Sequence, residues 1–254
     1  MLEVRDVSKR YGAITAVRHV SFTVKPGEVL GYLGPNGSGK STTVKMLVGL
    51  MPPTRGVILF DGVDIQADLL AYKAQVGYVP EEAHVYTHLT ASEYLRLTGR
   101  LRGLAPGPLE EKIDRFLKLF GLDTDYHAPL SAFSKGMRQK VLLSAAIIHN
   151  PRLVVLDEPV SGLDVSTALV LRAVVQSLAA DGRIIFYSSH ELDTIERIST
   201  RVMILHDGVV VADDSAARLR ELSNAPSLED VFAKLAVRRD LDATAQRLIE
   251  AVRL

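Results

Sequence analysis

The alternation of apolar and polar positions along the chain predicts strands and helices in turn. Short apolar runs bounded by turn residues occur at residues 29–33, 76–79, 153–156 and 184–187. Their length and composition indicate buried strands of the kind found in parallel sheets. Apolar residues follow the first run at helical spacing, at Val44, Leu47 and Val48, so we expect a helix there. The pattern therefore predicts an α/β fold.

Two other regions have β-strand patterns. Residues 2–8 alternate between apolar and polar side chains, and residues 21–24 form a second short strand that ends at a proline–glycine turn. Tyr11 lies in a glycine-containing loop between them. It is either an ordinary half-buried loop tyrosine or a flat ring that stacks on a nucleotide base. Near the end of the chain, Asp207-Gly208 between apolar runs predicts a β-hairpin.

The stretch from about residue 83 to residue 150 predicts a helical insertion in this framework. Residues 91–102 and 109–120 have helical patterns, and a glycine- and proline-rich segment separates them. Ser134 is the expected N-cap of a third helix, which ends near His149 before an Asn-Pro pair.

Helices are also expected in the second half of the chain. One begins at Asp164 and continues to Ala180, and residues 214–254 have helical patterns with a possible cap at Ser227. We expect one domain over residues 1–236, followed by a helical tail over residues 237–254.

One glycine-rich stretch carries the clearest chemistry, because it matches the phosphate-binding loop pattern G-x-x-x-x-G-K-[ST]. Its residues are Gly34, Pro35, Asn36, Gly37, Ser38, Gly39, Lys40, Ser41 and Thr42. Glycines let successive backbone N–H groups converge on phosphate oxygens. Lys40 adds a positive charge at the β- and γ-phosphates, and the Ser41 hydroxyl is placed to ligate Mg²⁺. A strand before the loop and a helix after it make a chance match a poor explanation.

Three further polar residues follow predicted buried strands. Asp157 and Glu158 come after residues 153–156, and His190 comes shortly after residues 184–187. In an open parallel sheet, ligands bind at the carboxyl ends of the strands, where the phosphate-binding loop also lies. Asp157 is therefore the candidate Mg²⁺ ligand, Glu158 the candidate general base for water, and His190 a candidate γ-phosphate contact. The structural alternatives are a solvated strand end for the two acids and an ordinary core or surface histidine for His190.

Composition limits the classes of protein that fit this pattern. The 254 residues include 47% hydrophobic residues, and 30 basic residues balance 30 acidic ones, so bulk charge gives no reason to expect nucleic acid. The absence of cysteine excludes disulfides and cysteine–zinc sites, which fits a reducing cytoplasm. No uncharged stretch exceeds 11 residues, far fewer than the 18 or so that span a bilayer. We therefore expect a soluble chain, whose membrane role, if any, comes through a partner.

Taken in order, these motifs resemble those of the ATP-binding-cassette (ABC) transporter ATPases over nearly the whole chain. Residues 34–42 resemble the Walker A motif, and residues 153–158 resemble Walker B. Residues 133–137, Phe-Ser-Lys-Gly-Met, are similar to the family signature, in which Ser134 and Gly136 keep the usual residue types. Residues 161–164 resemble the D-loop, and His190 resembles the switch histidine. Tyr11 resembles the tyrosine that stacks on adenine.

The chain also departs from the usual motifs. Lys135 and Met137 replace a glycine and a glutamine of the signature, so the contacts of that glutamine are in doubt. The Q-loop position holds Glu81, whose carboxylate still offers an oxygen to Mg²⁺ or water and could couple the nucleotide to a membrane partner. These departures and the residues at 227–232 resemble the export branch with separate ABC-2-type membrane subunits.

The resemblance implies a P-loop NTPase fold: a RecA-like core, an antiparallel β-subdomain and an inserted helical subdomain. It implies an ATPase with ATP and Mg²⁺ as ligands, and two copies that enclose two ATP molecules head to tail. The implied partners are a second nucleotide-binding subunit and integral membrane permease subunits at the cytoplasmic face of the cell membrane. An importer ATPase remains an alternative, as does a soluble cassette that acts on ribosomes or DNA. For the exporter reading, we expect the membrane contact at residues 83–89, although ordinary loop packing would also suit them.

Overall fold

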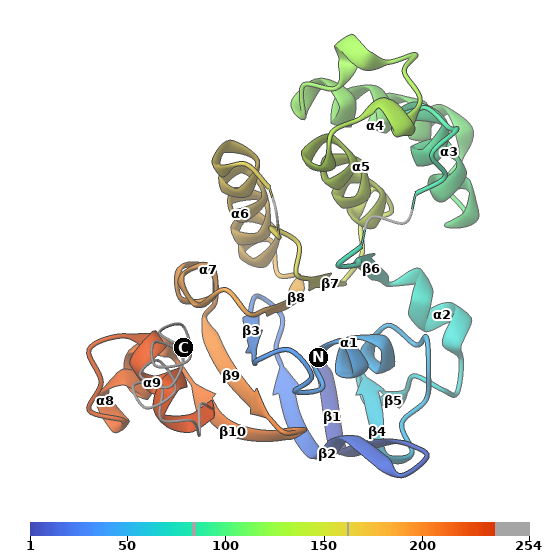
Figure 1. Cartoon of the computed structure of the whole chain (residues 1–254). Coiled ribbons are helices and arrows are strands. Elements are labelled where there is room, and N and C mark those ends of the chain that lie inside the picture. The colour runs from blue at the N-terminus through green and yellow to red at the C-terminus, as the bar shows by residue number, and fades with distance from the viewer. Residues whose placement is uncertain (83–84, 162, 237–254) are drawn as a thin grey trace, which may run out of the picture.

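The computed structural model describes residues 1–82, 85–161 and 163–236, and it contains two β-sheets with helices around them (Figure 1). The expected tail at residues 237–254 lies outside the described residues, as do Gly162 of the D-loop-like segment and residues 83–84 of the expected membrane contact. The fold is the α/β P-loop fold that the motifs implied, with a core sheet, an antiparallel sheet and an inserted group of helices.

The core sheet has six strands in the order β10-β9-β3-β8-β7-β6. Their bounds are β3 Val29–Leu33, β6 Val76–Val79, β7 Leu153–Asp157, β8 Ile184–Ser189, β9 Arg201–His206 and β10 Val209–Asp214. All neighbouring pairs are parallel except β9 and β10, which form the hairpin predicted at Asp207-Gly208. The carboxyl ends of β3, β6, β7 and β8 therefore lie at one edge of the sheet.

The second sheet has four antiparallel strands in the order β2-β1-β4-β5. Their bounds are β1 Leu2–Tyr11, β2 Ile14–Val24, β4 Arg55–Phe60 and β5 Val63–Asp64. An apolar cluster packs this sheet, the core sheet and the first helix together. At its centre Phe186 lies 5.0 Å from Tyr32 and 6.0 Å from Phe22, measured between ring centroids, so aromatic contacts link the two sheets.

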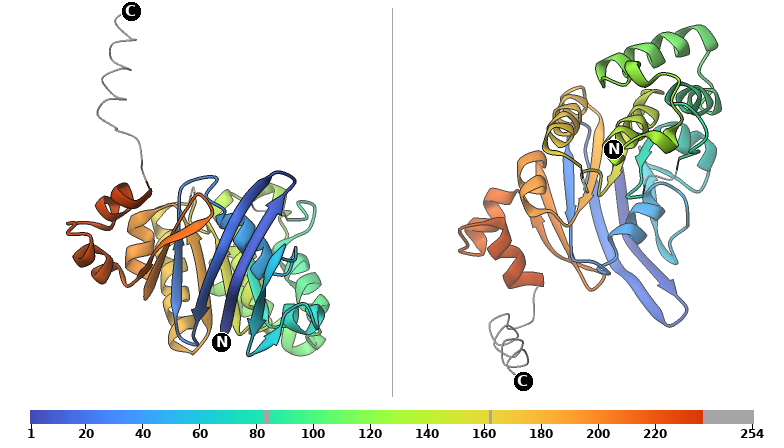
Figure 2. Two further views of the ribbon diagram at one scale, coloured as in Figure 1. Left: turned by 90° about the horizontal axis from the view of Figure 1, so that it is seen from below. Right: turned by 45° about the horizontal axis from the view of Figure 1, so that its top comes forward.

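Three helices form the insertion between β6 and β7: α3 Ala91–Leu101, α4 Pro106–Leu119 and α5 Lys135–Ile147. Figure 1 and Figure 2 show these three helices together, at the opposite end of the molecule from α8 Ala216–Leu222 and α9 Leu228–Ala236. The other helices are α1 Lys40–Leu47, α2 Leu69–Ala74, α6 Val165–Ala180 and α7 Leu192–Ile198, with short 3₁₀ turns at Asp123–Asp125 and Leu130–Ala132.

The predicted cap residues begin the helices where expected. The side chain of Ser134 accepts the Met137 N–H, and that of Asp164 accepts the Thr167 N–H. The Ser227 hydroxyl accepts the Asp230 N–H at the start of α9. Each contact satisfies a backbone donor that the first turn of a helix leaves free.

The prediction for the N-terminal region was wrong in one respect: Tyr11 is the last residue of β1, and β2 begins as early as Ile14. The pairing of these strands is interrupted at several points, and Asp6 and His19 have positive φ angles of 51°. Such irregularities break the two-residue alternation, so the sequence pattern hid most of β2. The short helices α2 and α7 also had no prediction.

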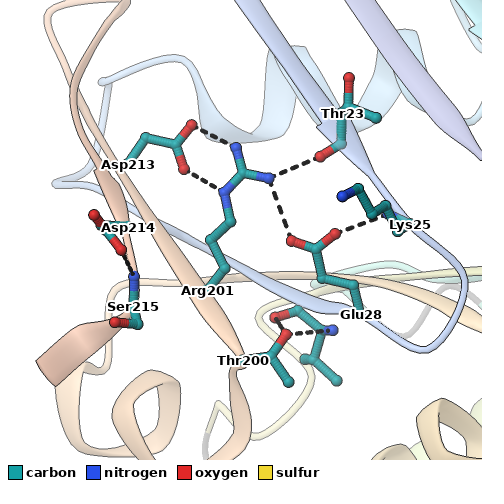
Figure 3. A network of polar contacts seen from close by, with 9 residues as sticks. Thr23, Lys25, Glu28, Thr200, Arg201, Asp213, Asp214 and Ser215 are labelled. Atoms are coloured by element: carbon teal, nitrogen blue, oxygen red, sulfur yellow. Dashed lines mark hydrogen bonds and ion pairs between the residues drawn. The ribbon is translucent and has the colours of Figure 1, made fainter. Parts of the chain in front are cut away.

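A polar cluster around Arg201 joins the two sheets (Figure 3). The guanidinium donates to both carboxylate oxygens of Asp213 on β10, at 2.6 Å each. It also donates to the carbonyl oxygen of Thr23 on β2 at 2.8 Å and to Glu28 before β3 at 3.3 Å. One planar donor group thus connects the end of β2, the residue before β3 and the β9–β10 hairpin.

We expect Arg201→Met to lower the free energy of unfolding by about 1–3 kcal/mol, because it leaves Asp213 and Glu28 without their cation in a partly enclosed site. Urea denaturation followed by circular dichroism measures this. Arg115→Met is the matched control, since Arg115 forms an ion pair with Glu111 on the same helix and both side chains are exposed. Equal stability of the two variants would contradict the role given to Arg201.

Candidate functional site

The candidate site lies where β3, β6, β7 and β8 end. A pocket of about 160 Å³ opens there, next to the N-terminus of α1. Its lining residues are Ala16, Asn36, Gly37, Gly39, Lys40, Ser41, Thr42, Glu81 and Glu158. The structure therefore brings the predicted phosphate-binding loop, the predicted base and the predicted Q-loop residue into one cavity.

Two positions of the loop accept only glycine. A Cβ atom at Gly34 would lie 2.5 Å from Ser38 Oγ and 2.6 Å from the Leu205 carbonyl oxygen. Gly39 has a φ of 107°, and a Cβ atom there would lie 2.5 Å from the Ala16 carbonyl oxygen. The loop thus packs tightly against the chain behind it at both glycines, which restricts its conformation.

Lys40 is the buried cation of this pocket, with 7% of its surface exposed. Its Nζ donates to the carbonyl oxygens of Gly34 at 2.7 Å and Pro35 at 3.3 Å, and it lies 3.8 Å from Glu158 Oε1. Burial lowers the pKa of Lys40, while the carboxylates of Glu158 and Asp157 act in the opposite direction. The ammonium group is thus held at the loop, and its present partners are ones that phosphate oxygens can replace.

Glu158 occupies a strained and buried position directly after β7. Its φ is 47°, in the left-handed region that non-glycine residues rarely adopt, and only 5% of its surface is exposed. Its N–H donates to the Ser188 carbonyl oxygen at 2.9 Å, and its Oε2 accepts from the Ser189 hydroxyl at 3.0 Å. His190 Nδ1 lies 2.8 Å from Glu158 Oε1. The sequence predicted Glu158 and His190 at this edge of the sheet but gave no signal for a role of Ser189.

Asp157 has the properties of a carboxylate that holds a divalent cation. It is 4% exposed, and its Oδ1 has no hydrogen-bond partner among the described residues. Burial raises the pKa of Asp157 to about 6, and the negative charges of Glu81 and Glu158 add to this effect. A buried carboxylate oxygen without a partner is costly unless a cation or a proton joins it, so the residues present fit a metal ion here.

Comparison with known proteins identifies the family. The family profile described as "ABC transporter" matches residues 17–161. NatA, an ABC transporter ATP-binding protein of Bacillus subtilis, is 34% identical over 243 residues, which is 94% of this chain and 99% of NatA. The chain belongs to the ABC transporter ATP-binding family. The bacitracin transport ATP-binding protein BcrA of Bacillus licheniformis is a further relative, 35% identical over 84% of this chain and 69% of its own length.

Solved structures of ABC cassettes share this fold. One, the ATP-binding subunit of an ABC transporter, superposes with a TM-score of 0.86 at 35% identity and covers 92% of this chain and 99% of its own. Another, a dimeric bacterial ABC transporter cassette, has a TM-score of 0.78 at 25% identity and covers 85% of this chain and 98% of its own. The chain is thus an ATP-binding subunit of the ABC transporter type.

Other predicted site residues of this ABC cassette do not line the pocket. Tyr11 is 45% exposed at the end of β1, where its hydroxyl contacts Met51 Sδ at 2.9 Å and Lys9 Nζ lies 5.7 Å from the ring centroid. Ser134 and Gly136 lie at the N-terminus of α5 in the helical insertion. Separately, none of the helices in the described part of the chain has the length and apolar character to cross a membrane.

We expect Lys40→Ala to weaken ATP binding and to lower the hydrolysis rate by at least about 10²-fold, the usual loss when one preorganised electrostatic contact is removed. Titration with a fluorescent ATP analogue and a phosphate-release assay measure the two effects. Lys45→Ala is the control, because Lys45 lies on the same helix but outside the pocket lining. A folded Lys40→Ala protein that hydrolyses ATP normally would remove Lys40 from the site.

Proposed function

We propose that this ABC cassette hydrolyses ATP, with Glu158 as the general base, and that the reaction powers transport through membrane subunits. The observation that carries the proposal is the meeting of Glu158 with Lys40 in one buried pocket on the phosphate-binding loop. Few charged side chains are buried in proteins without a functional or structural partner, and this pair faces the place where phosphates would lie.

In the proposed reaction a water oxygen attacks the γ-phosphorus atom, and the bond to the β–γ bridging oxygen breaks. Glu158 accepts the proton of the attacking water, and ADP leaves as phosphate is released. Lys40 stabilises the negative charge on the phosphate oxygens, and the N–H groups of residues 37–42 surround them. His190, which lies within contact distance of Glu158 Oε1, would orient that carboxylate and contact the γ-phosphate.

Asp157, Ser41 and Glu81 are the residues that would hold Mg²⁺. Asp157 supplies the buried oxygen that has no hydrogen-bond partner within residues 1–82, 85–161 and 163–236, and Ser41 and Glu81 line the same pocket as the loop. When bound, the ion neutralises charge on the β- and γ-phosphates. Glu81 follows β6, where the chain leaves the core sheet for the helical insertion, so a contact there could also pass the state of the nucleotide to the insertion.

The remaining site residues fit a second copy of the cassette. Ser134 and Gly136 lie outside the pocket of their own chain, at the N-terminus of a 13-residue helix. A helix N-terminus with free N–H groups favours phosphate, so in a head-to-tail dimer this segment would face the nucleotide on the partner's loop. The solved structure of a dimeric ABC cassette supports this arrangement. ATP would then close the dimer and hydrolysis would open it, while Tyr11 stacks on adenine.

Relatives whose names refer to bacitracin transport and linearmycin resistance support an exporter, and with it a location of this subunit at the cytoplasmic face of the membrane.

Docking of a membrane subunit would use the start of the helical insertion. There Tyr86 is 59% exposed and lies beside His88 and Tyr94, with ring centroids 6.2 and 6.4 Å away. Val85 is partly buried against the core beneath it. An exposed aromatic ring on a supported surface suits a reversible, partly apolar contact. The proposed cassette spans residues 1–236, followed by a tail over residues 237–254.

We expect Glu158→Gln to hydrolyse ATP at least about 10²-fold more slowly than the wild type, because the amide keeps the shape of the side chain but cannot accept the proton. ATP affinity should remain, and the variant should accumulate as an ATP-bound dimer. Phosphate release and size-exclusion chromatography with ATP measure these effects. Turnover near the wild-type rate would show that another group is the base.

We expect Tyr86→Glu to abolish co-purification with the membrane subunits while ATP binding stays intact, since a charge replaces the ring at the proposed contact. Leu222→Glu is the control, because Leu222 is 63% exposed on α8, at the other end of the molecule (Figure 2). Unchanged association of Tyr86→Glu would place the contact elsewhere. Isolation of the native protein with ribosomes or DNA would contradict the transporter function itself.

A further inference from the structure

We propose that Ser189 is a positioning residue for ATP hydrolysis, because its hydroxyl holds the carboxylate of Glu158 in the orientation that a general base needs. This inference rests on the proposed role of Glu158. Ser189 does not line the pocket, so it would act through Glu158 and not by contact with the nucleotide.

The contacts of the Glu158 carboxylate divide between its two oxygens. Oε2 accepts from Ser189 Oγ at 3.0 Å, and this is the only hydrogen bond to the carboxylate among the described residues. Oε1 lies 3.8 Å from Lys40 Nζ and 2.8 Å from His190 Nδ1. It makes no hydrogen bond with the described residues. Ser189 thus fixes one oxygen and leaves the other to face the loop, where the attacking water would lie.

A fixed orientation matters here because the local backbone does not supply it. Glu158 follows the end of β7 with a φ of 47°, a conformation that other interactions must maintain. Two successive residues of the neighbouring strand β8 do so: the Ser188 carbonyl oxygen accepts the Glu158 N–H, and the Ser189 hydroxyl binds its side chain. Strand β8 therefore holds Glu158 at both its backbone and its carboxylate.

Ser189 is itself fixed by a second contact. Its Oγ accepts the Glu191 N–H at 3.0 Å, at the start of α7, which leaves its own proton for Glu158. Glu191 in turn accepts the Thr194 hydroxyl at 3.0 Å. Ser189 is fully buried, so bulk water cannot compete for either contact. The short chain of hydrogen bonds joins the first turn of α7 to the proposed base.

The test is Ser189→Ala in the full chain, with kcat, KM for ATP and equilibrium ATP affinity measured separately. We expect kcat to fall about 10- to 100-fold, the factor that corresponds to one hydrogen bond to a charged group, with KM and ATP affinity within about twofold of wild type. Ser189→Thr keeps the hydroxyl and should recover most of the lost kcat. Ser144→Ala is the matched control, because Ser144 is another buried serine whose hydroxyl donates a hydrogen bond, to Lys140 O on α5.

A double-mutant cycle separates positioning from simple loss of stability. If Ser189 acts through the Glu158 carboxylate, Ser189→Ala should not slow further the residual hydrolysis of Glu158→Gln in single-turnover experiments. An equal loss in both backgrounds would overturn the proposal, and so would a wild-type kcat for Ser189→Ala or a loss confined to KM. A wild-type rate for Glu158→Gln alone would instead contradict the proposed base. The two failures are therefore distinguishable.

Discussion

The site depends on charged groups that are removed from water yet remain close to one another. Lys40, Asp157 and Glu158 are exposed by 7%, 4% and 5%, respectively. Buried charges are costly unless partners compensate them. Here Lys40 Nζ lies 3.8 Å from Glu158 Oε1, but Asp157 Oδ1 has no hydrogen-bond partner in the described residues. The site is therefore incompletely compensated by the protein alone. A ligand made of phosphate groups and a cation, as proposed above, would supply the missing charges of both signs.

The parallel sheet makes this concentration of charge possible. Strands β3, β7 and β8 are neighbours and run in the same direction, so residues far apart in the chain end at one edge. The loop after β3 is shaped by glycine, and Glu158 after β7 is held by the backbone and by a side chain of β8. The strands thus position Asp157 and Glu158, while the loop adds N–H donors, Lys40 and the Ser41 hydroxyl.

The same architecture places the proposed site residues on two separate parts of the molecule. The pocket belongs to the core sheet, whereas Ser134 lies on α5 in the helical insertion, which the figures show projecting from that sheet (Figure 1). A site built this way would be complete only when another cassette supplies its α5 N-terminus. Glu81 and Tyr86 follow β6, where the chain enters the insertion, so in the proposed function a signal between nucleotide and membrane subunits would have a short covalent route.

The sequence by itself determined the apolar strands, the order of the motifs and three helix caps, at Ser134, Asp164 and Ser227, because these depend on residues close together in the chain. It also determined that Asp157, Glu158 and His190 should meet the phosphate-binding loop, since parallel strands end at one edge. Only the tertiary structure decided the extent of β2, because the irregular pairing of β1 and β2 hides the alternation that predicts a strand. It also decided the joining of the sheets by Arg201 and the contact of Ser189 with Glu158. These contacts span 178 and 31 residues along the chain, and no local pattern specifies which distant partner a polar side chain will find.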